Sequence, residues 1–365
     1  MMIVKTKTPT RIDFAGGTLD LYPLYLFMDG GITVNAGLNL YSNVSIETGD
    51  DNKINIESID LDARISYKNI DDMTLEGTTG FIERAVKSYC PSTGINVKTR
   101  NTAPKGSGLG ASSSLLMALS SALVKLAGDE IDIREIIERG AAIEAAHLGI
   151  PTGKQDYYAA MLGGIHILHF DEKGCYPEEI TVGPEFKKEI QRSLIVTFTG
   201  ISHFSGTNNW DMIKKAIDRT GETFDRMLEI KEIAKQTGEA IKKHDLEKIG
   251  VLIGNEWECR KRLAPGISNF FIDTAIENAR QAGAWGSKLC GAGGGGCMIT
   301  LTPPEKKKDV MEALLESGID LLDADLDFNG LVVEVENGSR RPEARGRRPD
   351  ARCRKSEVGS RRSDL

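Results

Sequence analysis

The segment PKGSGLGASSS, from Pro104 to Ser114, constrains this chain more than any other stretch. An alternating apolar run at Ile95–Thr99 precedes it, and a long apolar-periodic run at Leu115–Leu126 follows it, which predicts a strand, a glycine loop and a helix. Glycines allow backbone N–H groups to approach an anion closely, and the start of the helix adds the positive end of its dipole. The segment therefore predicts a polyphosphate site at the start of a helix.

Two other glycine motifs fit this segment less well. A Walker loop requires Lys-Ser or Lys-Thr directly after its last glycine, whereas this chain has Ala111-Ser112 there. A dinucleotide fingerprint requires an acidic residue about twenty positions further on, at the end of a second strand, whereas the chain continues into a helical run at Ile133–His147. A serine-capped helix start without a ligand would account for Ser112 but not for three glycines after a proline.

Length and composition exclude several classes of protein. With 365 residues, of which 40% are hydrophobic, the chain can bury a large core, and its length favours two domains. It contains no run of eighteen apolar residues, and its first strand pattern begins too early for a secretory signal, so we expect a cytoplasmic protein without a membrane partner. Six cysteines and five histidines show no metal-binding spacing.

Charge is distributed unevenly along the chain. The formal net charge is −7, although the segment after Arg340 is basic. An acidic body does not favour nucleic-acid binding. The segment 338–365 is rich in Arg, Pro and Gly and poor in large apolar residues, so we expect a disordered basic tail that has no partner.

The order of strand and helix patterns predicts an α+β fold. A break in periodicity near 171–190 predicts a linker, with an N-terminal domain at 1–185 and a C-terminal domain at 186–337. The expected strands are Ile3–Thr6, Ile32–Asn35, Ser42–Thr48, Ile54–Ile59, Ile65–Lys68, Ile95–Thr99, Ile165–Phe170, Leu194–Phe198, Cys297–Leu301 and Leu331–Glu336. The expected helices cover 78–90, 112–127, 133–148, 209–219, 221–242, 245–262, 268–282 and 304–317.

Three further segments place polar groups next to glycines. Arg11–Tyr22 follows the first strand pattern, and loops at strand ends often carry function because the sheet positions them. Glu144–Asp156 contains two carboxylates. Lys288–Gly296 ends in four consecutive glycines, an unusual linker between two ordered elements because glycine costs backbone entropy. Taken alone, the first could be a tight turn and the second a helix cap.

Together the four segments resemble the GHMP kinase superfamily, which includes galactokinase, homoserine kinase, mevalonate kinase and phosphomevalonate kinase. Pro104–Ser114 is similar to the family's Pro-x-x-x-Gly-Leu-Gly-Ser-Ser pattern, and Lys288–Gly296 is similar to its C-terminal glycine motif. Arg11–Tyr22 and the segment around Asp156 look most like the D-glycero-D-manno-heptose 7-phosphate kinase branch. The resemblance covers about residues 3–337. It implies a ribosomal protein S5 domain 2-like N-terminal domain and a ferredoxin-like C-terminal domain.

The resemblance implies a role for each matched residue. Asp156 would be the catalytic aspartate that accepts the proton of the attacking hydroxyl, and Arg11 the basic residue beside it. Ser112 and Glu144 would ligate Mg²⁺, and Ala111 replaces the first serine of the usual pair. ATP would be bound by Pro104, Lys105, Gly106, Ser107, Gly108, Leu109, Gly110, Ala111, Ser112 and Ser113. The substrate would be bound by Gly17, Thr18, Asp20, Gly153, Gln155, Gly293 and Gly294.

The acceptor is expected to be a sugar, because one carboxylate, here Asp20 and also Asp13, can accept two hydroxyl hydrogen bonds. We rank the anomeric hydroxyl of a heptose 7-phosphate first. Arg260–Arg262 would clamp its phosphate or would be an ordinary basic helix end, and 199–210 would be a substrate loop. The alternatives are a galactokinase- or fucokinase-like hexose kinase and a nucleotide- and sugar-binding sensor without turnover. The protein would be a monomer or a homodimer.

Overall fold

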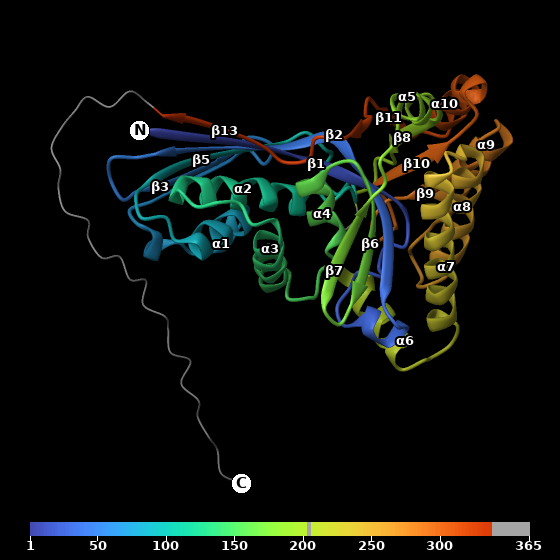
Figure 1. The fold of residues 1–365 in the computed structure, drawn as a ribbon, viewed down its shortest axis with the longest axis horizontal. Helices are drawn as coiled ribbons and strands as arrows, with labels where there is room; N and C mark the ends of the chain where they lie inside the picture. The colour runs from blue at the N-terminus through green and yellow to red at the C-terminus, as the bar shows by residue number, and fades with distance from the viewer. Residues whose placement is uncertain (203–205, 338–365) are drawn as a thin grey trace, which may run out of the picture.

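The computed structural model describes residues 1–202 and 206–337. Within these ranges the chain forms a nine-stranded sheet and a four-stranded sheet (Figure 1). The strands of the larger sheet are β1 (Met2–Ala15), β2 (Gly31–Thr48), β3 (Ile54–Ser58), β4 (Ala63–Tyr67), β5 (Ile95–Asn101), β6 (Ile165–Asp171), β7 (Gly174–Glu179), β12 (Leu326–Asp327) and β13 (Val332–Asn337). Those of the smaller sheet are β8 (Leu194–Phe198), β9 (Gly286–Leu289), β10 (Cys297–Leu301) and β11 (Asp320–Leu322).

The helices lie in two groups (Figure 1). The larger sheet is accompanied by α1 (Gly80–Tyr89), α2 (Ala111–Ala127), α3 (Ile133–Leu148) and α4 (Gln155–Leu162). The second half contains α5 (Pro184–Ser193), α6 (Gly206–Ile217), α7 (Thr223–Lys242), α8 (Leu246–Arg260), α9 (Phe270–Gln281) and α10 (Lys307–Glu316). Short 3₁₀ helices cover Leu24–Met28, Ile70–Asp72 and Pro304–Lys306. In α2 every residue from Ser113 to Leu123 is buried, as expected for a helix without a charged face.

The sheet topology confirms the α+β class. The smaller sheet is antiparallel and has the order β11-β8-β10-β9. Along the chain, the elements of this half come in the order strand, helices, two strands, helix and strand. This is the split βαβ arrangement of ferredoxin-like folds. The larger sheet is mainly antiparallel, although β3 and β5 run parallel.

The long strand β2 corrects one expectation. The sequence predicts two separate strands, Ile32–Asn35 and Ser42–Thr48, but the structure has one strand of 18 residues. A Cβ on Gly37 would lie 2.8 Å from the Asp327 carbonyl oxygen, so this glycine permits the close approach of β12 and does not end the strand.

The chain passes between the two halves twice. Residues 171–179, which the sequence predicts to be part of a linker, form the β6–β7 hairpin of the larger sheet. After β11 the chain returns, and β12 and β13 pair with β2 and β1. The expected C-terminal domain therefore loses its last two strands to the larger sheet, while the boundary at 185 stays a prediction. The expected tail, 338–365, lies outside the described residues.

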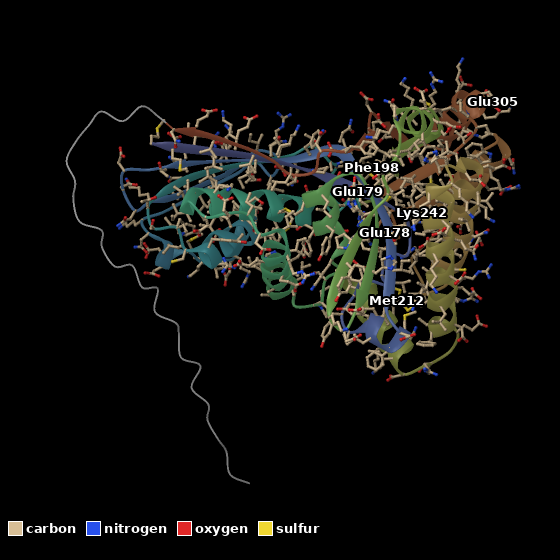
Figure 2. The ribbon with its side chains drawn as sticks, viewed as in Figure 1. Glu178, Glu179, Phe198, Met212, Lys242 and Glu305 are labelled. Atoms are coloured by element: carbon tan, nitrogen blue, oxygen red, sulfur yellow. The ribbon has the colours of Figure 1, made fainter. Side chains whose placement is uncertain are left out.

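An apolar cluster holds the two halves together. It contains Ile12 and Val34 of the larger sheet together with Ile253 of α8 and Ile299 of β10. At its edge, Lys242 of α7 forms an ion pair with Glu178 of β7 at 2.7 Å (Figure 2). A shared apolar core of this kind fixes the loops of one half relative to those of the other. No helix within the described part of the chain is long and apolar enough to cross a membrane.

Candidate active site

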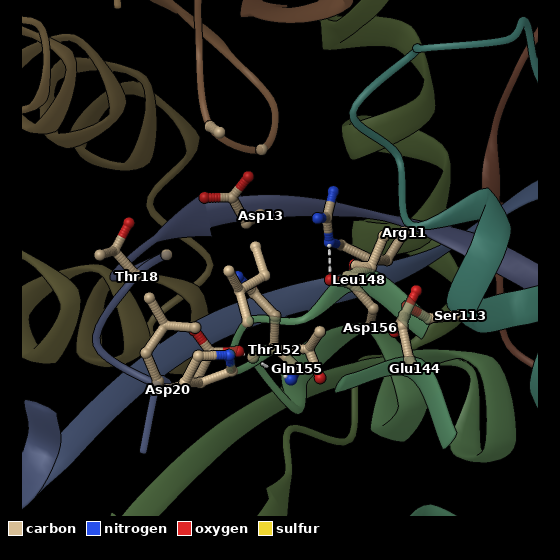
Figure 3. A pocket seen from close by; sticks show the side chains of 17 residues that line it. Arg11, Asp13, Thr18, Asp20, Ser113, Glu144, Leu148, Thr152, Gln155 and Asp156 are labelled. Atoms are coloured by element: carbon tan, nitrogen blue, oxygen red, sulfur yellow. Dashed lines mark hydrogen bonds and ion pairs between the residues drawn. The ribbon is translucent and has the colours of Figure 1, made fainter. Parts of the chain in front are cut away.

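A cavity of about 130 Å³ lies where the end of β1, the starts of α2 and α4 and the glycine loop before β10 meet (Figure 3). The sequence predicts many of its lining residues, namely Arg11, Gly17, Thr18, Asp20, Ser113, Glu144, Gly153, Gln155 and Asp156. Asp13, which the sequence also suggests as an acceptor of sugar hydroxyls, lines the cavity too, and the lining residues that the sequence does not assign are Leu21, Leu148, Ile150, Pro151, Thr152, Gly291 and Ala292. Segments from both halves of the molecule thus form one site.

Asp156 and Arg11 form an ion pair in this cavity (Figure 3). Asp156 stands in the first turn of α4, and its Oδ1 accepts a hydrogen bond from Arg11 Nε at 2.7 Å. Arg11 Nη1 also donates to the Gly108 carbonyl oxygen at 2.6 Å. Burial alone would lower the pKa of Arg11, but the charges of Asp156 and Asp13 outweigh it and raise the pKa. A permanent positive charge is therefore held between the carboxylate and the glycine loop.

The loop before α2 has the backbone of an anion site. Gly106, Gly108 and Gly110 have φ values of 70°, 70° and 72°, which favour glycine. Space requires glycine as well, since a Cβ on Gly108 would lie 2.5 Å from the Cys290 carbonyl oxygen. Gly110 is the N-cap of α2 and supplies no side-chain cap, so the first N–H groups of the helix remain available to an anion. The individual ATP contacts of residues 104–113 stay predictions.

The C-terminal glycine motif packs on this loop. Cys297 N donates to the Ser107 carbonyl oxygen at 2.6 Å, and Ser202 Oγ donates to the Lys105 carbonyl oxygen at 2.7 Å. The two glycines predicted to bind substrate lie elsewhere: Gly294 N donates to the Ile267 carbonyl oxygen at 2.6 Å, and a Cβ on Gly293 would lie 2.6 Å from Ile267 Cγ2. The motif residues that line the cavity are instead Gly291 and Ala292. Part of the expected substrate loop, 203–205, lies outside the described residues.

Glu144 and two serine hydroxyls supply oxygen donors beside the loop. Glu144 Oε2 accepts hydrogen bonds from Ser113 Oγ at 3.0 Å and from the Tyr157 hydroxyl. Burial raises the pKa of Glu144, against the effect of hydrogen bonds from Tyr157, Ser113 and Ser112. Ser112, the predicted ligand, is exposed at the start of α2, whereas Ser113 is buried.

These donors fit Mg²⁺, which prefers oxygen ligands and usually takes only one or two from the protein, the others coming from water and phosphate. Across residues 1–202 and 206–337, no group of three or more His, Cys, Asp or Glu residues could hold a metal ion by itself.

Asp20 is buried at the opposite wall. Its Oδ2 accepts a hydrogen bond from Gln155 N at 3.0 Å. Burial raises the pKa of Asp20 to about 6, with a smaller contribution from the charge of Asp156. A Cβ on Gly153 would lie 2.2 Å from Asp20 Oδ2, so glycine is required there for the carboxylate to reach its position.

A buried charge cluster beside the cavity is absent from the sequence predictions. Lys288 Nζ lies 2.6 Å from Asp13 Oδ2 and 3.1 Å from Glu256 Oε2. Arg260 Nε donates to Glu256 Oε1 at 2.8 Å, and its Nη2 donates to the Gly17 carbonyl oxygen at 2.7 Å. The cluster joins β9 and α8 of the second half to β1 and the loop after it.

This cluster rules out the expected phosphate clamp for Arg260, which is 2% exposed and fully engaged. Lys261 and Arg262 pair with Glu258 on the outer side of α8. The sequence could have indicated this burial, because Arg260 follows the apolar Ile253 by seven residues and therefore lies on the same, buried face of the helix.

Comparisons with known proteins agree with this geometry. Residues 78–164 match the GHMP kinases N terminal domain, and residues 239–320 match the GHMP kinases C terminal domain. The chain is 27% identical over 320 residues to a D-glycero-alpha-D-manno-heptose 7-phosphate kinase from Campylobacter jejuni, covering 86% of this chain and 94% of that protein. It is 26% identical over 333 residues to a bifunctional fucokinase/GDP-fucose pyrophosphorylase from Arabidopsis thaliana, covering 86% of this chain and 31% of that protein.

A solved structure shows the same fold. It is that of a D-glycero-D-manno-heptose 1-phosphate kinase from Bacteroides thetaiotaomicron, with a TM-score of 0.75 and 26% identity over 92% of this chain and all of that one. The fold and the matched domains define a phosphotransferase. The chain has the two-domain GHMP kinase fold and contains segments that match both GHMP kinase domains.

Proposed function

We propose that this protein is an ATP-dependent sugar kinase and that its acceptor is the anomeric hydroxyl of a heptose 7-phosphate. The observation that carries the proposal is the convergence of Asp156, Arg11 and Asp20 in one cavity beside a glycine loop. GHMP kinases use ATP as the phosphoryl donor. The similarity to a heptose 7-phosphate kinase over 86% of the chain supports the choice of acceptor.

In the proposed reaction, Asp156 accepts the proton of the acceptor hydroxyl as its oxygen forms a bond to the γ-phosphorus and the bond to the ADP oxygen breaks. Arg11 holds Asp156 in place and offsets the negative charge that develops on the transferring group. Ser112, Ser113 and Glu144 would hold Mg²⁺, which supplies charge neutralisation at the phosphates when it is bound. Asp20 would position the sugar by accepting hydrogen bonds from its hydroxyls.

A hexose kinase of the fucokinase type is the second candidate. It is favoured by the similarity to the Arabidopsis protein and by the burial of Arg260, which removes the expected phosphate clamp. A sensor without turnover is disfavoured, because a binding protein does not need the Asp156–Arg11 pair.

The substrate panel that tests the proposal measures ADP release with heptose 7-phosphate, fucose, galactose and mevalonate as acceptors. We expect turnover with heptose 7-phosphate and a phosphorylated anomeric carbon in the product. Turnover with fucose or galactose alone would favour the second candidate. Turnover with mevalonate alone would contradict the sugar kinase proposal.

Asp156→Asn tests the catalytic role. Because the amide cannot accept the proton, we expect kcat to fall by about 10²- to 10⁴-fold, while the Kd for ATP stays within a few-fold of the original. Asp129→Asn is a matched control, since Asp129 is exposed and remote from the cavity. An Asp156→Asn variant that retained full kcat would remove Asp156 from the mechanism.

A further inference from the structure

Asp13 has one carboxylate oxygen without a protein partner. The residue lies on β1 two positions after Arg11, is 1% exposed and lines the cavity. Its Oδ2 accepts a hydrogen bond from Lys288 Nζ at 2.6 Å, whereas its Oδ1 is buried and has no hydrogen-bond partner in the described part of the chain. A buried acceptor without a donor is costly and rare in proteins, so this oxygen points to a donor that a ligand supplies.

The surroundings of Asp13 keep it an acceptor. Burial alone would raise the pKa of Asp13, but the charges of Lys288, Arg11 and Arg260 outweigh burial and lower it. The carboxyl group is therefore ionised at neutral pH and accepts hydrogen bonds only. Figure 3 shows Asp13 at the cavity, on the same strand as Arg11. An anionic acceptor group such as a carboxylate would be repelled at this position, whereas a hydroxyl would be bound.

Gln155 presents a second acceptor of the same kind. Its Oε1 is buried, and no group in the described ranges donates to it. A Cβ on Gly17 would lie 2.9 Å from Asp13 Oδ2 and 3.3 Å from Gln155 Nε2, so the two side chains converge on Gly17. Two side chains beside one glycine, each with an unpaired acceptor oxygen, match a ligand that carries several hydrogen-bond donors, as the hydroxyls of a sugar do.

We propose that Asp13 is a specificity-determining residue that accepts, through Oδ1, a hydrogen bond from an acceptor hydroxyl other than the one that is phosphorylated. Lys288 is the positioning residue, because it holds Oδ2 and leaves Oδ1 as the unpaired acceptor of a residue that lines the cavity. In the proposed reaction the hydroxyl that is phosphorylated is bound by Asp156, which pairs with Arg11, so Asp13 is left for a different hydroxyl. This assignment rests on the proposed function, since it requires a polyhydroxy acceptor.

The test crosses Asp13→Asn with monodeoxy analogues of whichever sugar the wild-type enzyme phosphorylates. An asparagine would keep its carbonyl oxygen on Lys288 and place its amide at the position of Oδ1, so the unpaired acceptor is lost. For one deoxy position we expect kcat/KM of the wild type to fall by about 10- to 100-fold, as for a hydrogen bond to a charged group. The same deletion should cost the variant less than about 3-fold. Every other deoxy position should carry the same penalty in both enzymes.

Two controls separate this role from a structural one. The double variant Asp13→Asn/Lys288→Gln removes the buried cation along with its partner and serves as the test if Asp13→Asn alone fails to fold. At the deoxy position that costs the wild type about 10- to 100-fold in kcat/KM, the double variant should also lose less than about 3-fold. The Kd for ATP should stay within a few-fold of the wild-type value in each folded variant. Equal penalties at all deoxy positions in wild type and variant would overturn the role of Asp13. Turnover of mevalonate and of no sugar would instead overturn the proposed function itself.

Discussion

Two carboxylates near the start of the chain illustrate how single residues acquire different roles from their surroundings. Asp13 lies among Lys288, Arg11 and Arg260, and its pKa is lowered although burial acts in the opposite direction. Asp20, seven residues further on, is also buried, but backbone hydrogen bonds and the charge of Arg11 do not outweigh the effect of burial, so its pKa rises to about 6. The first group is a fixed anion, whereas the second titrates close to neutral pH.

We expect Asp20 to make stability and acceptor binding depend on pH in opposite directions. Because its pKa is raised from 3.8 to about 6, the native state holds a proton that the unfolded state releases between these values. The contribution of Asp20 to the free energy of unfolding therefore falls as pH rises through this range, and it stays lost above it.

For Asp20→Asn at pH 7.5 we expect the free energy of unfolding to rise by roughly 1–3 kcal/mol, because no buried charge remains. The acceptor KM should rise about 10-fold or more. Urea denaturation at pH 5 and pH 7.5 measures the first effect. A variant that is less stable than wild type at pH 7.5 would contradict this prediction. In the wild type, acceptor KM should increase as pH falls below about 6.

Among the secondary-structure elements, α2 is bounded by glycines with positive φ at both ends, and the two differ in what surrounds them. Gly110 and Gly128 have φ values of 72° and 83°. A Cβ on Gly110 would lie 2.8 Å from Asp156 Cγ, whereas a Cβ on Gly128 would meet nothing within 4 Å. Substitutions at these two glycines therefore separate the effect of backbone strain from the effect of displacing Asp156.

Substitution by alanine at each end tests this difference. Gly128→Ala should cost about 1–2 kcal/mol of stability through left-handed strain and leave kcat unchanged. Gly110→Ala carries the same strain and also displaces Asp156, so kcat should fall by about 100-fold. Steady-state kinetics and thermal unfolding of both variants provide the measurement. Equal kcat values for the two variants would contradict the expected effect of displacing Asp156.

The elements that the sequence does not reveal share a physical cause. β7 contains Gly174, Pro177 and two glutamates, a composition typical of turns, and it is a strand because it pairs with β6. β9, with the sequence Gly-Ser-Lys-Leu, has no β-branched residue and depends on its pairing with β10. By contrast α2, α3 and β5 follow their local patterns closely. Tertiary pairing decides the short elements, and a single sequence does not contain that information.

The same distinction applies to the site at the scale of the whole molecule. Arg11, Glu144 and Asp156 belong to motifs that can be found locally in the sequence. The Asp13–Lys288 pair joins residues 275 positions apart and belongs to no local pattern. Such a pair becomes visible only when the second half of the chain is placed against the first.

The buried charge cluster between the halves should matter for stability. Glu256→Gln leaves Lys288 and Arg260 buried without their shared partner, so we expect the free energy of unfolding to fall by about 3–5 kcal/mol. Glu258→Gln on the same helix is the matched control, since Glu258 is half-exposed and should contribute less than about 1 kcal/mol. Urea denaturation of both variants measures the difference. Similar losses for the two would mean that the cluster does not hold the halves together.

The second half of the molecule is inserted into the first, because the chain leaves the larger sheet after β7 and rejoins it at β12. Two covalent crossings, at 180–183 and 323–325, therefore connect the halves, and both run past the same apolar cluster. The two halves therefore cannot separate by opening one connection: any movement of one relative to the other has to deform both crossings and repack the apolar cluster between them.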